Sequence, residues 1–187
     1  ITQMGITQPN GSMEGKEARY GSVLSALWCV STTVTSNGSV NSMHDSFTAL
    51  SGIFPMLGMQ LNSFYGGVGV GFINMFLFMI LAVFISGLMV GRTPEFMGKK
   101  IEAREVKIAI LVALLHPLMI LGGTALAAHT WAITQNAGDV LKWLNNPGFH
   151  GFSEMLYEFT SSAANNGSGF EGLGDNTAFW NISTGIV

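Results

Sequence analysis

A ten-residue segment with the chemistry of a cation site occurs twice in this chain. Val-Ser-Thr-Thr-Val-Thr-Ser-Asn-Gly-Ser at residues 30–39 returns 129 positions later as Phe-Thr-Ser-Ser-Ala-Ala-Asn-Asn-Gly-Ser at residues 159–168. Apolar sequence flanks both copies. Irregular backbone inside a membrane is tolerated where it lines a cavity or is buried in protein, and carbonyl oxygens can replace the water around a cation. The repeat therefore favours two re-entrant loops that present oxygens to one ion.

The expected ligands of this ion are neutral oxygens. Hydroxyl, amide and backbone oxygens come from Thr35, Ser36, Asn37, Gly38, Asn165, Asn166 and Gly167. Glycine allows torsions that turn carbonyls toward one axis, and each preceding short helix directs its partly negative end at the loop. Calcium and magnesium sites normally include carboxylates, so a monovalent ion is expected. The residues alone do not choose between potassium and sodium.

The alternative for each copy is an ordinary turn, because Asn-Gly is a common turn dipeptide. One copy would be weak support for an ion site. Two copies in matching flanks, with Thr-Ala ten residues after each glycine, favour the ion-binding interpretation.

The composition places these loops in a membrane protein. Only 10% of residues are charged, against about 25% in soluble domains. No Asp, Glu, Lys or Arg occurs over residues 46–91 or 108–138, and about 20 apolar residues of helix cross a bilayer. Nothing resembles the basic, aromatic surface of a nucleic-acid-binding protein. We expect an all-α polytopic membrane protein.

Four segments are expected along the chain. Residues 1–19 read as a polar extracytoplasmic loop, and residues 20–91 and 108–187 as two parallel helix–loop–helix units. Residues 92–107 hold five of the eight Lys and Arg residues. Basic residues concentrate in cytoplasmic connections, so this charged segment is expected on the cytoplasmic side.

Within the first unit, the sequence predicts a short helix over residues 20–34. Pro55 is expected to break any helix over residues 43–61. A spanning helix is predicted over residues 66–91, where Gly67 and Gly71 favour close helix packing over a local break.

In the second unit, a spanning helix is predicted over residues 106–128, with a kink near Pro117. A loop over residues 130–151 should follow. A short helix over residues 152–163 is expected to begin at Ser153 as its N-cap.

Enzymatic chemistry finds little support. His44 and Asp45 form no catalytic triad and are expected to line a polar vestibule or to pack together. His116 and His129 have no partners at metal-ligand spacing, and the lone Cys29 excludes an intramolecular disulfide. No phosphate-binding loop is present, so we expect no catalytic residue and no metal beyond the transported ion.

Four longer runs resemble the potassium-transporting ATPase A chain family, the potassium-translocating subunit of the bacterial Kdp complex. They are Asn41-Ser-Met-His-Asp-Ser-Phe-Thr-Ala-Leu50, Gly91-Arg-Thr-Pro-Glu-Phe-Met-Gly-Lys-Lys-Ile101, His150-Gly-Phe-Ser-Glu-Met-Leu-Tyr157 and Ser161-Ser-Ala-Ala-Asn-Asn-Gly-Ser168. The resemblance covers the chain from about residue 14 onward. It implies four pore-loop repeats around one pore, of which this chain would hold the third and most of the fourth.

The resemblance also implies roles and partners. Potassium would be the bound ion, and Gly38 and Gly167 the filter glycines. The residues implied in gating or in coupling to an ATP-hydrolysing subunit are Gly67, Gly69, Gly71, Arg92, Lys99, Lys100 and Arg104. Small accessory subunits, the two missing repeats and the lipid of a bacterial inner membrane would be further partners. A passive or sodium-coupled potassium channel or symporter of the same superfamily is the alternative.

Overall fold

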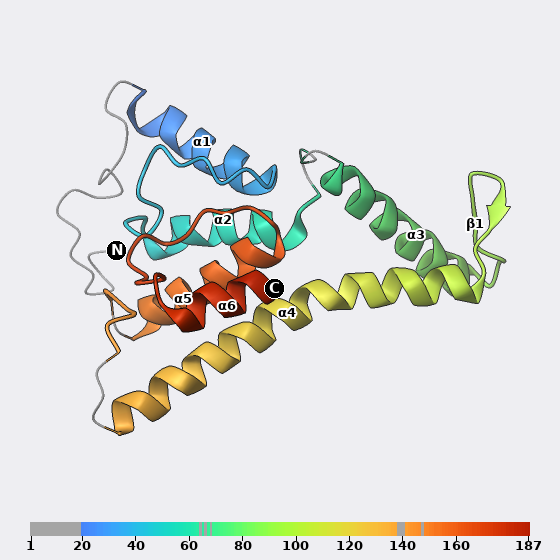
Figure 1. Cartoon of the computed structure of the whole chain (residues 1–187). Helices are drawn as coiled ribbons and strands as arrows, with labels where there is room; N and C mark the ends of the chain where they lie inside the picture. The colour runs from blue at the N-terminus through green and yellow to red at the C-terminus, as the bar shows by residue number, and fades with distance from the viewer. Residues whose placement is uncertain (1–19, 64, 66, 68, 138–140, 147) are drawn as a thin grey trace.

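The computed structural model describes residues 20–63, 65, 67, 69–137, 141–146 and 148–187 (Figure 1). The predicted polar loop over residues 1–19 lies outside the described residues, as do Gly66 and Val68. Six helices and one small hairpin make up the described part: α1 (Gly21–Val34), α2 (Ala49–Leu61), α3 (Val70–Val90), β1 (Glu95–Phe96), β2 (Lys99–Lys100), α4 (Ala103–Asn136), α5 (Phe149–Ala163) and α6 (Ala178–Ile186). The prediction of a mostly helical chain is confirmed.

The helices form a bundle with a long arm. Helices α1, α2, α5 and α6 gather at one side, whereas α3 and the first half of α4 extend away from them and end at the hairpin (Figure 1). The hairpin strands are antiparallel, with Glu95 opposite Lys100 and Phe96 opposite Lys99.

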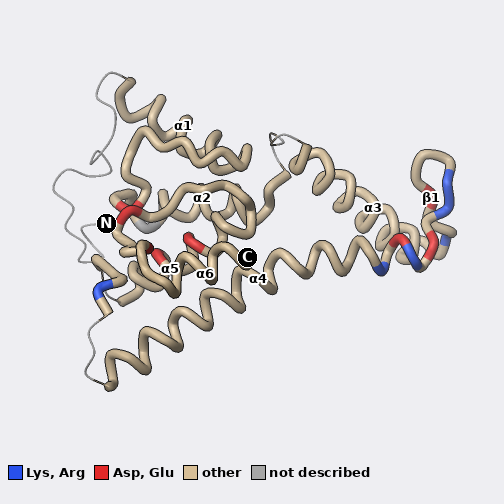
Figure 2. The backbone as a smooth tube through the Cα atoms, viewed as in Figure 1, with Lys and Arg blue, Asp and Glu red and all other residues tan. Residues whose placement is uncertain are grey.

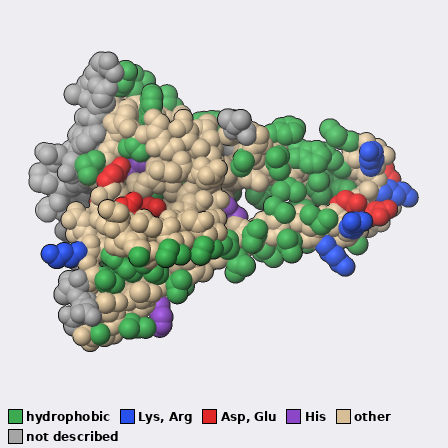
Figure 3. Space-filling model, in the orientation of Figure 1, with side chains coloured by type: hydrophobic (Ala, Val, Ile, Leu, Met, Phe, Trp, Pro, Cys, Tyr) green, Lys and Arg blue, Asp and Glu red, His purple; other side chains and the backbone are tan. Residues whose placement is uncertain are grey.

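Helices α3 and α4 are the two described helices that are long and apolar enough to cross a membrane. They have 21 and 34 residues, which at about 1.5 Å per residue exceeds or matches a hydrocarbon core of about 30 Å. Apolar side chains such as Phe72, Ile85, Leu111 and Leu118 are exposed along them. Figure 3 shows this apolar surface along the arm and the charged side chains at its far end.

A helix–loop–helix unit occurs twice in the bundle, first as α1–α2 and then as α5–α6. The second helix of each unit has a threonine N-cap, Thr48 for α2 and Thr177 for α6. Each hydroxyl accepts a backbone N–H three residues later, from Ser51 at 3.4 Å and from Trp180 at 3.4 Å. The sequence repeat therefore extends to matching local structure.

The second unit packs on α4 through a buried apolar cluster between α4, α5 and α6. Its members are Ala127, Trp143, Met155, Phe159, Leu173 and Trp180. Gly123 on α4 makes this packing possible, because a Cβ atom there would overlap the ring of Phe159.

Proline does not break α2, contrary to the prediction. Pro55 lies inside Ala49–Leu61 and is fully buried. A proline within a helix removes one backbone hydrogen bond, and the packing of α2 against α1 outweighs that loss. The helix ends instead at Asn62, which adopts a left-handed conformation with φ 42°.

The predicted ends of α4 were also wrong. The helix continues through residues 130–136, which were expected to form a loop. Thr130 and Thr134 donate their hydroxyls back to the carbonyls of Leu126 and Thr130, at 2.8 and 2.6 Å, so these polar residues stay compatible with the helix. Pro117 lies inside α4, and Figure 1 shows the helix changing direction near its middle.

The predicted N-cap of α5 was wrong as well. The helix begins at Phe149 after Gly148, whose φ of 96° suits glycine. Ser153 lies inside the helix and donates to the carbonyl of Phe149 at 3.2 Å. The helix thus starts three residues before the predicted residues 152–163.

Candidate ion-binding loops

The first loop (residues 35–41) and the second loop (residues 165–169) lie directly against each other. A Cβ atom on Gly38 would be 2.6 Å from the carbonyl oxygen of Asn166, 2.8 Å from the carbonyl carbon of Gly167 and 3.0 Å from the nitrogen of Ser168. All three are backbone atoms, so no side chain fits between the loops. The structure brings together the two glycines that lie 129 residues apart in sequence.

Both loops close on the preceding helix in the same way. The N–H of Asn37 donates to the carbonyl of Thr32 at 3.0 Å, and the N–H of Asn166 donates to the carbonyl of Ser161 at 2.9 Å. Each asparagine Oδ1 then accepts the backbone N–H two residues later, at 3.1 Å in the first loop and 3.0 Å in the second. The asparagine side chains therefore shape the turns from within.

One asparagine also links the two loops. Asn166 donates its Nδ2 hydrogens to the carbonyls of Thr32 at 2.9 Å and Thr33 at 3.5 Å. The Thr32 carbonyl thus accepts from both asparagines, and the Thr32 hydroxyl donates to the carbonyl of Asn37. Both loops are therefore anchored by hydrogen bonds to the C-terminal end of α1.

The two glycines serve different purposes, contrary to the expectation that both adopt unusual torsions. Gly167 has a φ of 91°, whereas Gly38 lies outside the left-handed region. The left-handed residue of the first loop is Ser36, with φ 55°, and its counterpart Asn165 has φ 51°. Gly38 is required for close approach, and Gly167 for its backbone conformation.

In the described part of the chain, one hollow runs along α1 to residues of the first loop, and two further hollows border the loops. The first of these two, of about 550 Å³, adjoins the glycines and is lined by Gly38, Val40, Asn41, Ser42, Met43, Gly167, Ser168, Gly169 and Glu171. The second, of about 570 Å³, adjoins the residues that precede the glycines, and its polar lining is Gln60, Asn62, Asn74, His116 and Asn165. Solvent or an ion can thus approach the loops from two sides.

Residues between α2 and α3 contact the first loop. Ser36 donates to Oδ1 of Asn62 at 2.8 Å, and Asn74 of α3 donates to the carbonyl of Asn62 at 3.1 Å. A Cβ atom on Gly67 would be 2.6 Å from the carbonyl oxygen of Thr35. This segment is therefore in contact with a predicted ion ligand.

The glycine run does not start α3, contrary to the predicted helix over residues 66–91. Gly67 precedes the helix, Gly69 caps it with φ 93°, and Gly71 is a buried residue of its first turn. Gly67 therefore lies in a break between two helices, and the predicted role in helix packing is wrong for this residue. The break separates Leu61 from Val70.

The predicted coupling residues lie far from the loops. Arg92, Lys99, Lys100 and Arg104 belong to the hairpin and its flanks, and Figure 2 shows these charges gathered around β1 at the end of the arm. Glu102 and Glu105 form a capping box that begins α4, with the Glu102 N–H donating to Glu105 Oε2 at 2.9 Å.

A partly buried polar cluster near the loops was not predicted from the sequence. Nε2 of His150 contacts Oδ1 of Asp45 at 2.8 Å, and Asn146 donates to Asp45 Oδ2 and Glu154 Oε1, both at 3.2 Å. This hydrogen bond to Asp45 raises the pKa of His150 above its usual value. Gly172 packs against it, since a Cβ there would lie 2.6 Å from both carboxylates.

The same cluster has the donor types of a metal site. One ligand atom from each of Asp45, His150 and Glu154 lies within 4.8 Å of the others. Hydrogen bonds from Asn146 and His150 satisfy three of the four carboxylate oxygens, and Oε2 of Glu154 is buried with no hydrogen-bond partner among the described residues. Asp45 thus joins the segment after the first loop to α5, and the expected pairing of His44 with Asp45 is replaced by separate partners.

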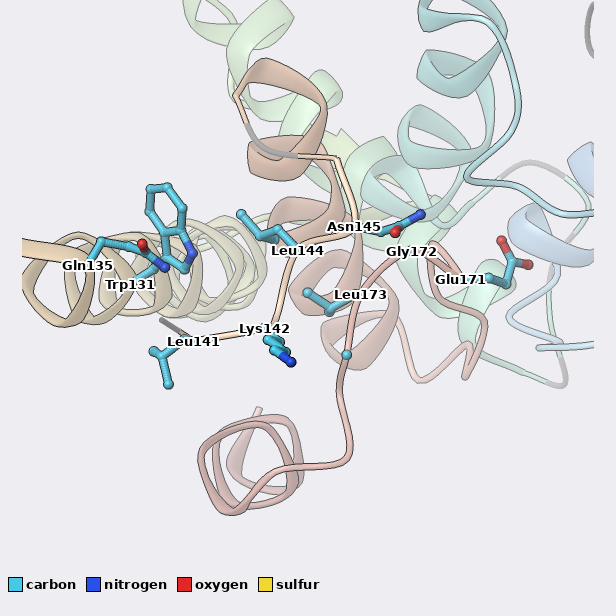
Figure 4. Close-up of a pocket in the computed structure, with 10 residues that line it drawn as sticks. Trp131, Gln135, Leu141, Lys142, Leu144, Asn145, Glu171, Gly172 and Leu173 are labelled. Atoms are coloured by element: carbon cyan, nitrogen blue, oxygen red, sulfur yellow. The ribbon is translucent and has the colours of Figure 1, made fainter. Parts of the chain in front are cut away.

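A further hollow of about 730 Å³ lies between the end of α4 and the segments on either side of α5. Figure 4 shows Trp131 and Gln135 on the α4 side, with Leu144, Asn145 and Gly172 across from them. None of the predicted ion ligands belongs to its lining. The glycine loops remain the candidate site.

The sequence also matches known proteins. The family model described as potassium-transporting ATPase A subunit matches residues 1–187. The chain is 68% identical to the potassium-transporting ATPase potassium-binding subunit of Phocaeicola vulgatus and 66% identical to that of Flavobacterium johnsoniae. These matches cover 100% of this chain but 33% and 34% of the relatives. The chain therefore spans about a third of the length of the curated relatives it matches.

Proposed function

Because this chain belongs to the potassium-transporting ATPase A subunit family, we propose that it supplies part of the potassium filter of an ATP-driven uptake pump. The observation that carries the proposal is the contact of Gly38 with the backbone of residues 166–168. Two loops that touch at their glycines can present their oxygens to one ion.

The loops are suited to a monovalent cation. Their candidate ligands Thr35, Ser36, Asn37, Gly38, Asn165, Asn166 and Gly167 carry no formal charge. Carbonyl and hydroxyl oxygens would replace the water of potassium, and the C-terminal ends of α1 and α5 add partial negative charge. In this proposal the two loops are the third and fourth of four pore loops, and the rest of the full-length protein supplies the other two.

The break between α2 and α3 is proposed as the gate. Gly67 contacts the carbonyl side of Thr35, so movement of this segment would change the path directly below the first loop. Gly69 and Gly71 lie where the chain re-enters a helix, and their small size allows that helix start to shift.

The arm is proposed to couple the gate to ATP hydrolysis. Helix α3 leads from the break to the charged end that holds Arg92, Lys99, Lys100 and Arg104. A separate subunit would bind this end from the cytoplasm and hydrolyse ATP, while this chain performs no catalysis. The assembly, with small accessory subunits, would lie in the inner membrane of a bacterium as a multi-pass complex.

Site-directed crosslinking tests this assignment in the full-length protein. Met97 is 82% exposed at the hairpin tip, so Met97→Cys is expected to crosslink to the ATP-hydrolysing subunit. Ala137→Cys, exposed at the opposite end of α4, is the control and should give no such product. Potassium uptake should also cease when cellular ATP is depleted.

The alternative function gives the opposite result. A passive or sodium-coupled transporter would continue uptake after ATP depletion and would follow the sodium gradient. Absence of the Met97→Cys product together with such uptake would contradict the pump.

A further inference from the structure

We infer that His44, Tyr157 and Ser168 form a hydrogen-bonded chain that positions Asn166 and thereby sets the ion selectivity of the two loops. The inference rests on the proposed function of the loops and assigns roles to three residues outside the predicted ligand set.

The hydrogen-bonded chain is continuous and buried. Nδ1 of His44 lies 2.9 Å from the Tyr157 hydroxyl, and this hydroxyl lies 3.0 Å from Oγ of Ser168. Ser168 donates in turn to Oδ1 of Asn166 at 2.5 Å. His44 and Tyr157 are completely buried, and Ser168 and Asn166 are 4% and 6% exposed.

The orientation of the Asn166 amide is fixed by backbone groups. The N–H of Ser168 donates to Asn166 at 3.0 Å, so the atom it meets is the oxygen. The other end of the amide faces the carbonyls of Thr32 and Thr33, which only accept. If the amide were flipped, its NH₂ group would face the N–H of Ser168, and its oxygen would face the carbonyl oxygens of Thr32 and Thr33.

This orientation sets the direction of every bond in the chain. Ser168 has one hydroxyl hydrogen, which it gives to Asn166, so its oxygen accepts from Tyr157. The tyrosine hydrogen is then used, and its oxygen accepts from the Nδ1–H of His44. Burial lowers the pKa of His44 to about 4, so the ring is neutral with its single hydrogen on Nδ1.

The hydrogen-bonded chain links both helix–loop–helix units. His44 follows the first loop, Tyr157 belongs to α5, and Asn166 returns to the end of α1 through the Thr32 carbonyl. Residues that precede both loops and one that follows the first are thereby held at fixed distances from one another. All three links from Nδ1 of His44 to Asn166 are made, whereas Nε2 of His44 has no hydrogen-bond partner among the described residues. The buried links hold the geometry on which the spacing of the ion ligands depends.

Conservative variants of the full-length protein in its complex test the inference. Tyr157→Phe and Ser168→Ala each remove a hydroxyl that makes two of the hydrogen bonds, and each leaves buried partners unpaired. Such a loss corresponds to about a tenfold rise in the half-saturating potassium concentration. Discrimination of potassium from rubidium should fall, while the maximal uptake rate at saturating potassium should stay within about twofold of the parent, since the links act on ion binding.

Two controls match these variants. Tyr20→Phe removes a hydroxyl from a tyrosine that is 41% exposed and lies outside the proposed filter and gate. Ser39→Ala alters the equivalent position of the first loop, where the side chain is exposed and makes no hydrogen bond among the described residues. Both are expected to retain the parent half-saturation and selectivity.

Variants of His44 test the direction of the chain. An asparagine side chain can place its NH₂ near the position of Nδ1, whereas glutamine reaches toward Nε2. His44→Asn should therefore retain the parent half-saturation more closely than His44→Gln, which should resemble Tyr157→Phe.

The outcomes separate this inference from the proposed function. If Tyr157→Phe and Ser168→Ala lower only the amount of complex or the maximal rate, the residues are structural and the inference is overturned. If Gly38→Ala shifts half-saturation but the chain variants do not, the inference fails and the filter stands. If none of them shifts it, the filter assignment fails as well.

Discussion

Alanine in place of Gly38 is expected to raise the half-saturating potassium concentration of the full-length protein on the order of a hundredfold. The added Cβ would lie 2.6 Å from the carbonyl oxygen of Asn166 and 2.8 Å from the carbonyl carbon of Gly167. Backbone atoms cannot rotate away as a side chain would, so the loops must separate. Potassium-dependent uptake in whole cells measures the effect.

Two further glycines complete a graded series. Gly167→Ala meets no atom within 4 Å but must hold a φ of 91°, a penalty of about 1–2 kcal/mol that predicts a smaller, roughly tenfold rise. Gly122→Ala on α4 meets no atom within 4 Å and carries no left-handed φ, so it serves as the control. Aspartate at Gly38 or Gly167 should abolish high-affinity uptake, because it adds bulk and charge. Equal effects of alanine at Gly38, Gly167 and Gly122 would refute the steric argument.

Asn166→Asp is expected to have the second large effect, on the order of a hundredfold in half-saturation. The substitution keeps the shape of the side chain but replaces the NH₂ group that donates to Thr32 and Thr33 with an oxygen. A carboxylate would then face carbonyl oxygens at a position that is 6% exposed. Uptake kinetics with potassium and rubidium would show the loss of affinity and of selectivity.

Asn136→Asp is the matched control for this change. Asn136 is the exposed last residue of α4, so the same chemical change there should leave half-saturation unaltered. Parent-like potassium affinity in Asn166→Asp would show that the link between the loops has no role in ion binding.

The position of the loops was accessible from the sequence because it depends on local chemistry. Asn-Gly-Ser preceded by small hydroxyl residues forms turns with the same hydrogen bonding in both copies, with the asparagine Oδ1 accepting a backbone N–H in each. The Thr-Ala pair ten residues after each glycine also repeats in sequence, and the structure shows that its threonine is a helix N-cap in both copies. Repetition made these patterns readable without any knowledge of tertiary contacts.

Other features depend on contacts that the sequence does not display. His44 meets Tyr157 across 113 residues, and Asp45 meets His150 across 105. Their spacing matches no motif, since the folding of the whole bundle brings them together. Pro55 and Ser153 were misjudged for a related reason: local preferences predicted a break and a cap, whereas packing of α2 and α5 decided where the helices run.

For the two loop glycines, the sequence predicted their importance but not the physical reason for each. Sequence predicted that Gly38 and Gly167 matter, but assigned them one shared reason. The structure gives close approach as the reason for Gly38 and a left-handed φ as the reason for Gly167. Which reason applies depends on the neighbouring chain, which is known only after folding.

Locating the ion in the full-length protein tests the central claim most directly. Anomalous scattering from crystals of the complex grown with rubidium or thallium in place of potassium would reveal the bound ion. We predict a peak between the two loops, with oxygens of residues 35–38 and 165–167 around it. A peak at the carboxylates of Asp45 and Glu154, with none between Gly38 and Gly167, would contradict the account.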